Sequence, residues 1–141
     1  ISLYDYPVNT FVANFVGTMN LLAGRVRSRS ADMIRLEVPH IGELQLPIDA
    51  DAPDTESIHI SFRPHALRME VADAVRDARY IWMPGSIEAS EFLGESTRYR
   101  VRVGAQSLIA DHPHHMGLSR FPVGGAVSLG IEPSQMRLFG A

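Results

Sequence analysis

Apolar and polar residues alternate one by one over most of the chain, which is the spacing of β-strands with one solvated face. The clearest case is residues 33–48, where two alternating runs on either side of the break at 39–42 predict a β-hairpin. The alternation returns at 57–64 and again at 98–103. The pattern therefore predicts a mainly β fold built of many short antiparallel strands.

A short phrase of the sequence occurs twice. "SFRPHALRM" and "GIEPSQMRL" superimpose with an offset of 69 positions, which aligns Pro64 with Pro133 and Arg68 with Arg137. Proline ends a strand ladder because it has no N–H to donate, so each phrase predicts a corner. Since Arg68 and Arg137 occupy equivalent places, we expect them, with the neighbouring Arg63, to have a structural role at these corners through backbone carbonyls or an acidic side chain.

The strands around the repeated phrase also correspond. Segments 56–69 and 125–138 carry apolar residues at the same inward positions, so they are predicted to form the same strand–turn–strand unit. The alternative is a chance likeness between two hairpins that each contain a proline corner. The repeat favours two related β units, at about 21–71 and 79–140, packed into one antiparallel β-barrel assembly.

One segment has helical spacing instead. In residues 7–17 apolar side chains recur at the interval of one helical face, and Pro7 and Gly17 suit the two ends. Such a short helix is marginal alone, so its apolar stripe is expected to pack on the rest of this chain or on another one. The predicted interface residues of the stripe are Phe11, Val12, Phe15 and Val16.

Composition limits the possible functions. The 141 residues suffice for one domain or two small ones with a real core, since 45% of them are apolar. The net charge of −3 argues against a nucleic-acid binder, which usually carries a basic excess. The chain has no cysteine for a disulfide or a thiolate zinc site, and no apolar run approaches the ~18 residues of a membrane-spanning helix. The opening "ISLYDYP", without an initiator Met, leads us to expect a piece of a longer protein.

The sequence contains no motif for catalysis. An ATPase needs a glycine-rich loop that ends in Lys-Ser or Lys-Thr, and this chain has no lysine, since all thirteen basic residues are arginine. No Ser, His or Asp stands in an order that singles out a nucleophile. We therefore expect no catalytic residue, no cofactor and no enzyme activity in this fragment. Trp82 and Met83 are interpreted as core or interface packing, with a ligand shelf as the alternative.

The histidine-rich run at 110–117 is the most suggestive segment for metal chemistry. Asp111, His112, His114 and His115 are all potential metal ligands. Their spacing matches no strict ligand motif, so the run is interpreted as a polar loop without a metal. Opportunistic metal binding or pH sensing is the alternative.

A predicted strand presents Arg98, Arg100 and Arg102 on one face. Such a strand in a small barrel can contact nucleic acid if aromatic side chains for base stacking lie on the same face. Tyr99 faces the other way. The favoured interpretation is a solvated strand face that is balanced by acids such as Glu95.

Three phrases together resemble a known family. "LYDYPVNTFVANFVGTMNLLAGRV" resembles the segment that follows the nucleotide-binding domain in ATP-binding subunits of bacterial ABC importers. The matching positions are Tyr4, Pro7, Asn9, Phe11, Val12, Phe15, Val16, Gly17, Asn20 and Leu22. "FRPHALRM" resembles the family's Arg-Pro-Glu-x-Ile/Leu-Arg-Leu phrase, with His65 in place of the usual Glu. "SEFLGEST" is similar to its Glu-x-Leu-Gly stretch, carried by Glu91, Leu93 and Gly94.

The resemblance implies a TOBE-type regulatory domain with an OB-like, MOP-like antiparallel β-barrel and one short N-terminal helix. Residues 1–20 would connect an absent ATPase domain to the TOBE-type domain at 21–141. The absent domain, and not this fragment, would bind ATP and Mg. The implied parent is an ATP-hydrolysing subunit of an importer of the maltose, polyamine and ferric-iron class, cytoplasmic and peripheral on the inner face of the cell membrane.

The resemblance also implies partners. They are a second copy of the chain in a homodimer, the ATPase domain of the same chain and the transmembrane permease subunits, with no nucleic acid. The transported solute stays open among polyamine, phosphonate, ferric iron and sugar, and the short spacing from Gly17 to Asn20 favours the first three. The alternatives are a small-ligand module that binds oxyanions and, least favoured, an OB-type nucleic-acid binder.

Overall fold

The structure, a computed structural model, describes most of the chain. It contains ten β-strands and two short 3-10 helices within residues 19–39, 41–48, 53–74, 77–113 and 121–140. No α-helix occurs in these ranges, and no helix in them is long and apolar enough to cross a membrane. The helix predicted at 7–17, with its stripe of interface residues, lies outside the described residues.

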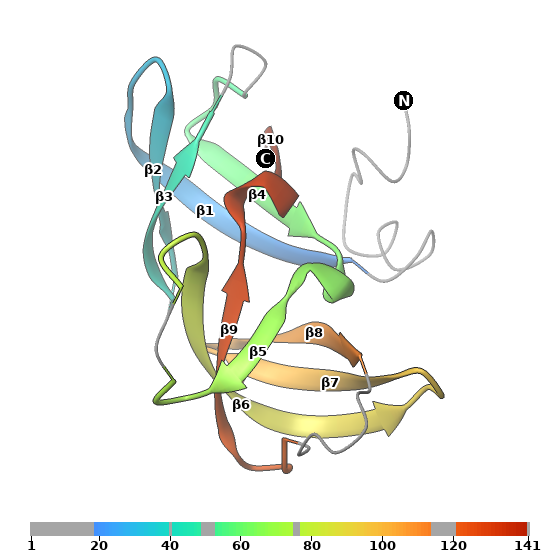
Figure 1. The fold of residues 1–141 in the computed structure, drawn as a ribbon. Helices are drawn as coiled ribbons and strands as arrows, with labels where there is room; N and C mark the ends of the chain where they lie inside the picture. Colours follow the sequence, from blue (N-terminus) through green and yellow to red (C-terminus); the bar gives the residue numbers. More distant parts are fainter. Residues whose placement is uncertain (1–18, 40, 49–52, 75–76, 114–120, 141) are drawn as a thin grey trace. The chain divides into compact units, whose positions relative to one another are not determined.

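The first compact unit is formed by the described residues up to Arg63 and from Pro133 onward. Its sheet has the strand order β10-β4-β1-β2-β3, with all neighbours antiparallel (Figure 1). The elements are β1 (Asn20–Arg29), β2 (Met33–Val38), β3 (Gly42–Pro47), β4 (Ser57–Phe62), the 3-10 helix η2 (Pro133–Gln135) and β10 (Arg137–Gly140).

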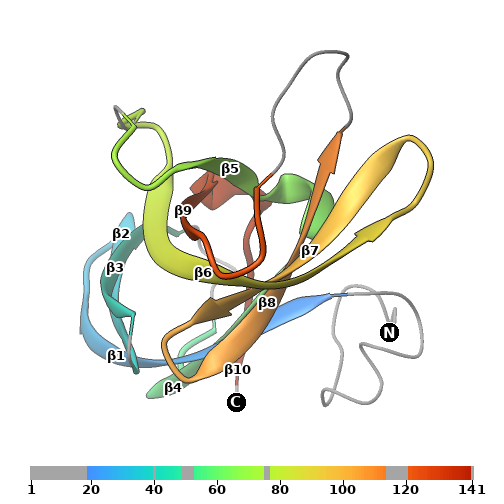
Figure 2. The same ribbon diagram turned by 90° about the horizontal axis from the view of Figure 1, so that it is seen from below.

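The second compact unit is the continuous segment Pro64–Glu132. Its sheet has the order β5-β9-β6-β7-β8 and is also antiparallel throughout, with a long β6–β7 hairpin that is clear in Figure 2. The elements are the 3-10 helix η1 (Pro64–Ala66), β5 (Arg68–Val71), β6 (Ile81–Phe92), β7 (Ser96–Val103), β8 (Gln106–Pro113) and β9 (Ala126–Ile131).

The two sheets have the same topology. Each strand of the first unit has a counterpart at the same place in the second, so that β10 corresponds to β5, β4 to β9 and β1 to β6. The register agrees as well: Arg137 lies opposite Ser61, and Arg68 lies opposite Gly130, and these pairs are related by the sequence offset of 69. The prediction that the doubled phrase forms one strand–turn–strand unit twice is confirmed.

The two 3-10 helices form the corners of the repeated unit. In each corner a backbone N–H three residues after the proline donates to the proline carbonyl, from Leu67 to Pro64 at 3.3 Å and from Met136 to Pro133 at 3.0 Å. Because a proline cannot extend the ladder, β4 and β9 end here. As a result β5, from the first sequence repeat, completes the sheet of the second unit, and β10, from the second repeat, completes the sheet of the first.

The predicted closed barrel needs a correction. Among the described strands each sheet is open, with β10 and β3 as the edges of one and β5 and β8 as the edges of the other. In the second unit the sheet curls enough for β8 to lie near η1, but no ladder joins its two edges. The edge strands β5 and β10 have only four residues each, and each pairs with one inner strand, β5 with β9 and β10 with β4.

The inward positions that the alternation predicts form the core of each unit. The most buried side chains of the first unit are Leu22, Ile34, Leu36, Val38, Ile58, Ile60 and Phe62. Those of the second unit are Met83, Val101, Val103, Leu108, Ala110, Leu129 and Ile131. The amphipathic strands therefore fold as expected, with the apolar face of each sheet removed from water.

Ser61 departs from the alternation of its strand. Strict alternation with its inward neighbours Ile60 and Phe62 would place it in solvent, but it is 0% exposed, and its hydroxyl has no hydrogen-bond partner among the described residues. Because β4 is an inner strand, Ser61 lies between the longer side chains of Leu21 on β1 and Arg137 on β10. Burial of a small side chain between two long neighbours cannot be read from alternation alone.

Two glycines at equivalent places differ in the space around them. Gly24 on β1 and Gly85 on β6 have the same register relative to β4 and β9. A Cβ atom at Gly85 would lie 2.6 Å from Cγ1 of Val101 and 3.0 Å from a backbone oxygen of β7, whereas the nearest atom to a Cβ at Gly24 is 3.4 Å away. The close approach of β6 to β7 therefore requires glycine at position 85, whereas the approach of β1 to β2 does not require glycine at position 24.

We expect Gly85→Ala to lower the free energy of unfolding by about 1–3 kcal/mol, because the added methyl group meets backbone as well as a side chain. Gly24→Ala is the matched control and should change it much less. Chemical denaturation followed by circular dichroism measures both variants. Equal losses of stability in the two variants would contradict the packing described here.

Candidate interaction sites

The predicted metal candidates are only partly within the described residues. His114 and His115 lie outside them, and His112 is on β8. The His112 ring meets Phe121 edge-on with 5.4 Å between centroids, and Phe121 meets Tyr99 in the same way at 5.8 Å. Within the described part of the chain, no group of three or more His, Cys, Asp or Glu side chains is arranged to hold a metal ion.

Arg68 is held close to the corner that contains Pro64. Its Nε donates to Oε1 of Glu70 at 2.8 Å, and its guanidinium carbon lies 5.3 Å from the centroid of the Tyr80 ring. The hydrogen bond to Glu70 raises the pKa of Arg68. An acid and an aromatic ring thus hold this arginine. Of the other corner residues, Pro64 is buried, Arg63 and Pro133 are half-buried, and Arg137 is exposed at the start of β10.

Next to Arg68 the side chains of Tyr80 and Trp82 form a stacked pair. Their ring centroids are 5.6 Å apart with an interplanar angle of 19°, and the indole N–H of Trp82 donates to the backbone oxygen of Asp77 at 2.9 Å. The Asp77 carboxylate pairs with Arg79, whose hydrogen bond lowers the pKa of Asp77 to about 2. These contacts hold both rings in place, as expected for structural packing.

Trp82 lies over Gly130, its cross-strand neighbour on β9. A Cβ atom at Gly130 would come within 2.7 Å of the indole ring. The glycine therefore creates the space in which the ring rests. Met83, the next residue, is 0% exposed, so its interpretation as core packing is confirmed.

The three arginines of β7 are all in ion pairs. Arg98 makes a two-pronged contact with Asp111, at 2.8 and 2.9 Å. Arg102 and Arg100 approach Glu88 at 3.1 and 3.5 Å, respectively. A hydrogen bond from Ser107, together with these arginines, lowers the pKa of Glu88. The prediction of a solvated, charge-balanced face on this strand is therefore confirmed.

The acids that balance this face are Glu88 and Asp111, and not Glu95, which the sequence suggested. Glu88 stands in a β-bulge of β6, between Ile87 and Ala89, which turns its side chain toward β7. Alternation alone does not indicate where a bulge occurs. The only signal in the sequence was the row of arginines, which requires acidic neighbours without specifying them.

The tip of the β6–β7 hairpin presents apolar side chains to solvent. Phe92 is 65% exposed and Leu93 is 46% exposed. Gly94 follows with φ of +96°, a backbone conformation that favours glycine in a tight turn. Leu93 and Gly94 belong to the Glu-x-Leu-Gly phrase of the family resemblance. That phrase did not indicate that the apolar residues beside it are exposed.

The fold defines a small β module in which one five-stranded antiparallel sheet occurs twice. A crystal structure of the cytoplasmic molybdate-binding protein ModG, with molybdate bound, has the same fold. It matches with a TM-score of 0.69 over 86% of this chain and 96% of that chain, at 12% sequence identity. At this identity the likeness concerns the fold alone.

The family model of the TOBE domain matches residues 60–139, which is more than half of the chain. The chain therefore belongs to the TOBE domain family, as the three phrases of the sequence predicted.

Curated relatives match the chain over almost its whole length. The maltose/maltodextrin import ATP-binding protein MalK of Photorhabdus laumondii is 28% identical over 99% of this chain. The spermidine/putrescine import ATP-binding protein PotA of Pseudomonas fluorescens is 28% identical over 100% of it. The matched parts are 37% and 38% of these relatives, so the chain spans well under half of their length.

The contact between Gly130 and the only tryptophan of the chain gives a direct test of the corner. We expect Gly130→Ala to displace the Trp82 ring, to shift its fluorescence emission to longer wavelength and to cost about 1–3 kcal/mol of stability. Ser61→Ala, at the equivalent position of β4, is the control. It removes a hydroxyl without a partner and should leave the emission unchanged. An unaltered spectrum in Gly130→Ala would refute the assigned packing.

Proposed function

We propose that this chain is the regulatory and dimerisation domain of the ATP-binding subunit of an ABC importer for a small solute. The observation that carries the proposal is the end-to-end match of the chain with one part of two kinds of import ATP-binding protein. Membership of the TOBE domain family supports the same conclusion. ATP and Mg would be bound by another part of the parent protein, which would lie at the cytoplasmic face of the membrane with its permease subunits.

The mechanism that follows is mechanical and not chemical. Two copies of the domain pair through apolar surface and keep two ATPase domains together while these open and close. A regulator that binds the domain shifts this cycle only by its difference in affinity for the two states. The predicted stripe at Phe11, Val12, Phe15 and Val16 and the exposed hairpin tip at Phe92 and Leu93 are the surfaces that we assign to such contacts.

The transported solute is proposed only by class. The relatives named above import maltose/maltodextrin and spermidine/putrescine, and the spacing from Gly17 to Asn20 favours polyamine, phosphonate or ferric iron over sugar. A nucleic-acid ligand is disfavoured because Arg98, Arg100 and Arg102 are already paired with acids. A small-ligand module is compatible with the regulatory role, and a charged hollow in the first unit favours it.

Pairing is tested by sedimentation equilibrium over a wide range of concentrations. We expect a reversible dimer whose dissociation constant rises by at least about tenfold in the double variant Phe11→Ser, Phe15→Ser, because apolar surface is lost from the interface. The double variant Thr10→Ser, Asn14→Ser changes the polar side of the same segment and should leave pairing intact. A chain that stays monomeric at every concentration would contradict the dimerisation role.

The regulatory role is tested by a chimera in which this chain replaces the matching part of the Photorhabdus laumondii import protein. We expect the chimera to support maltose import above the level of the same protein truncated at the junction. Import no higher than in the truncated protein would count against the proposal.

A further inference from the structure

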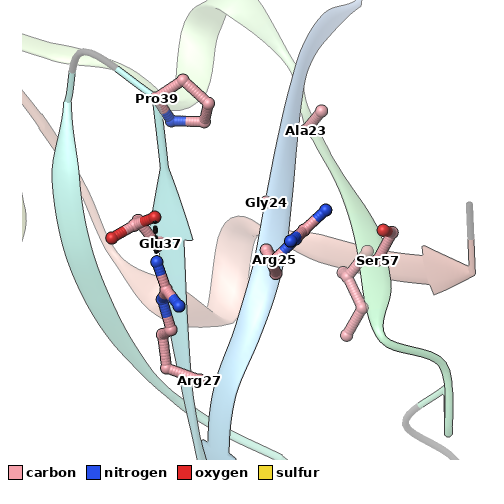
Figure 3. A pocket seen from close by; sticks show the side chains of 8 residues that line it. Ala23, Gly24, Arg25, Arg27, Glu37, Pro39 and Ser57 are labelled. Atoms are coloured by element: carbon pink, nitrogen blue, oxygen red, sulfur yellow. Dashed lines mark hydrogen bonds and ion pairs between the residues drawn. The ribbon is translucent and has the colours of Figure 1, made fainter.

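The first unit contains a hollow with a volume of about 350 Å³. Residues of β1, β2 and β4 line it, among them Ala23, Gly24, Arg25, Arg27, Glu37 and Ser57 (Figure 3). The volume is at the small end of the range of ~300–1,000 Å³ for ligand pockets. The hollow is therefore large enough for a small solute, and its lining includes both positively and negatively charged side chains.

Of the charged side chains that line this hollow, only Arg25 has no ion-pair partner among the described residues. It lies opposite Glu37 on one side and Ser57 on the other, but the Glu37 carboxylate is paired with Arg27. Among the described residues, no hydrogen bond or ion pair is made by the Arg25 side chain. It extends on the Ser57 side of β1, away from the Arg27–Glu37 pair (Figure 3). A guanidinium beside a hydroxyl is thus available to a ligand.

The second unit provides a natural comparison for the ion pair. Its counterpart of the Arg27–Glu37 pair is the Glu88–Arg102 pair, in which the two charges have changed places. Arg27 and Glu88 both stand in a β-bulge at the same point of the sheet. The charge pair across the bulge is therefore common to the two units and is explained by the fold.

Arg25 and Ser57 have no such explanation. Their counterparts in the second unit are Ser86 and Ala126, which have neither a positive charge nor, at the second position, a hydroxyl. The same sheet therefore forms in the second unit with Ser86 in place of Arg25. The fold does not require an arginine at this position, and its presence in the first unit points to a ligand.

We propose that this hollow binds a small solute that carries a phosphate or carboxylate group. The Arg25 guanidinium donates paired N–H groups to two oxygens of the anion, a geometry that suits both kinds of group. The Ser57 hydroxyl donates a further hydrogen bond, and the neutral Arg27–Glu37 pair borders the site. The inference deepens the proposed function and rests on it for its physiological meaning, since it gives the chemistry of a regulatory ligand.

The test is titration of the full chain with glycerol 3-phosphate and with citrate, followed by backbone amide shifts in NMR spectra. We expect saturable shifts centred on Arg25, Ser57 and their neighbours on β1 and β4. Glycerol, which lacks the anion, should produce none. Added salt should weaken the binding because the contact is charged and near solvent.

Two variants distinguish a built site from general surface charge. Arg25→Gln should weaken binding by about tenfold or more, since it removes a charge-assisted contact. Arg35→Gln removes the same charge from β2 of the same unit, but Arg35 is paired with Glu43 and does not line the hollow, so affinity should persist. Equal weakening by both variants, shifts scattered over the arginines of both units, or no saturable shift would overturn the inference. These outcomes leave the sedimentation and chimera results untouched, so the two proposals fail separately.

Discussion

The β5–β9 ladder is the interaction on which the rest of the structure depends. The second unit is one continuous segment, whereas the first is interrupted between Arg63 and Pro133. Because Arg68 lies opposite Gly130, the ladder holds the two ends of the second unit together. It thereby returns the chain to β4, so that β10 can complete the first sheet. Closing a loop of this length from an unfolded chain would cost about 4 kcal/mol of entropy. A folded second unit removes most of that cost.

The duplication separates what the fold requires from what this chain has added. The proline corners, the register of the exchanged strands and the ion pair at the bulge occur in both units, and they are the common framework. Arg25, which has no ion-pair partner among the described residues, lies in the first unit and corresponds to Ser86 in the second. The exposed Phe92 and Leu93 belong to the second unit. In the proposed regulatory role, a partner or ligand would recognise the surface that differs between the two units, because the common framework is the same in both.

The sequence predicted the strands and the repeated corner because both depend on local properties: side-chain alternation, and a residue that cannot extend a ladder. It did not predict that each repeat gives its last strand to the other unit, because strand pairing between distant segments leaves no local mark. Alternation also gives no sign that Ser61 is buried between two longer neighbours, or that Glu88, in a bulge of β6, balances the arginines of β7. The sequence also does not indicate which of Arg25 and Arg27 binds the Glu37 carboxylate, and therefore does not reveal the charged hollow beside Arg25.

Native-state hydrogen exchange at increasing denaturant tests the dependence of the first unit on the second most directly. The amides of β4 and β10 should open at a free energy equal to or below that of the amides of β5 and β9, because the first sheet loses its closing strand once the second unit unfolds. Amides of β4 and β10 that stay protected while those of β5 and β9 exchange would contradict this account.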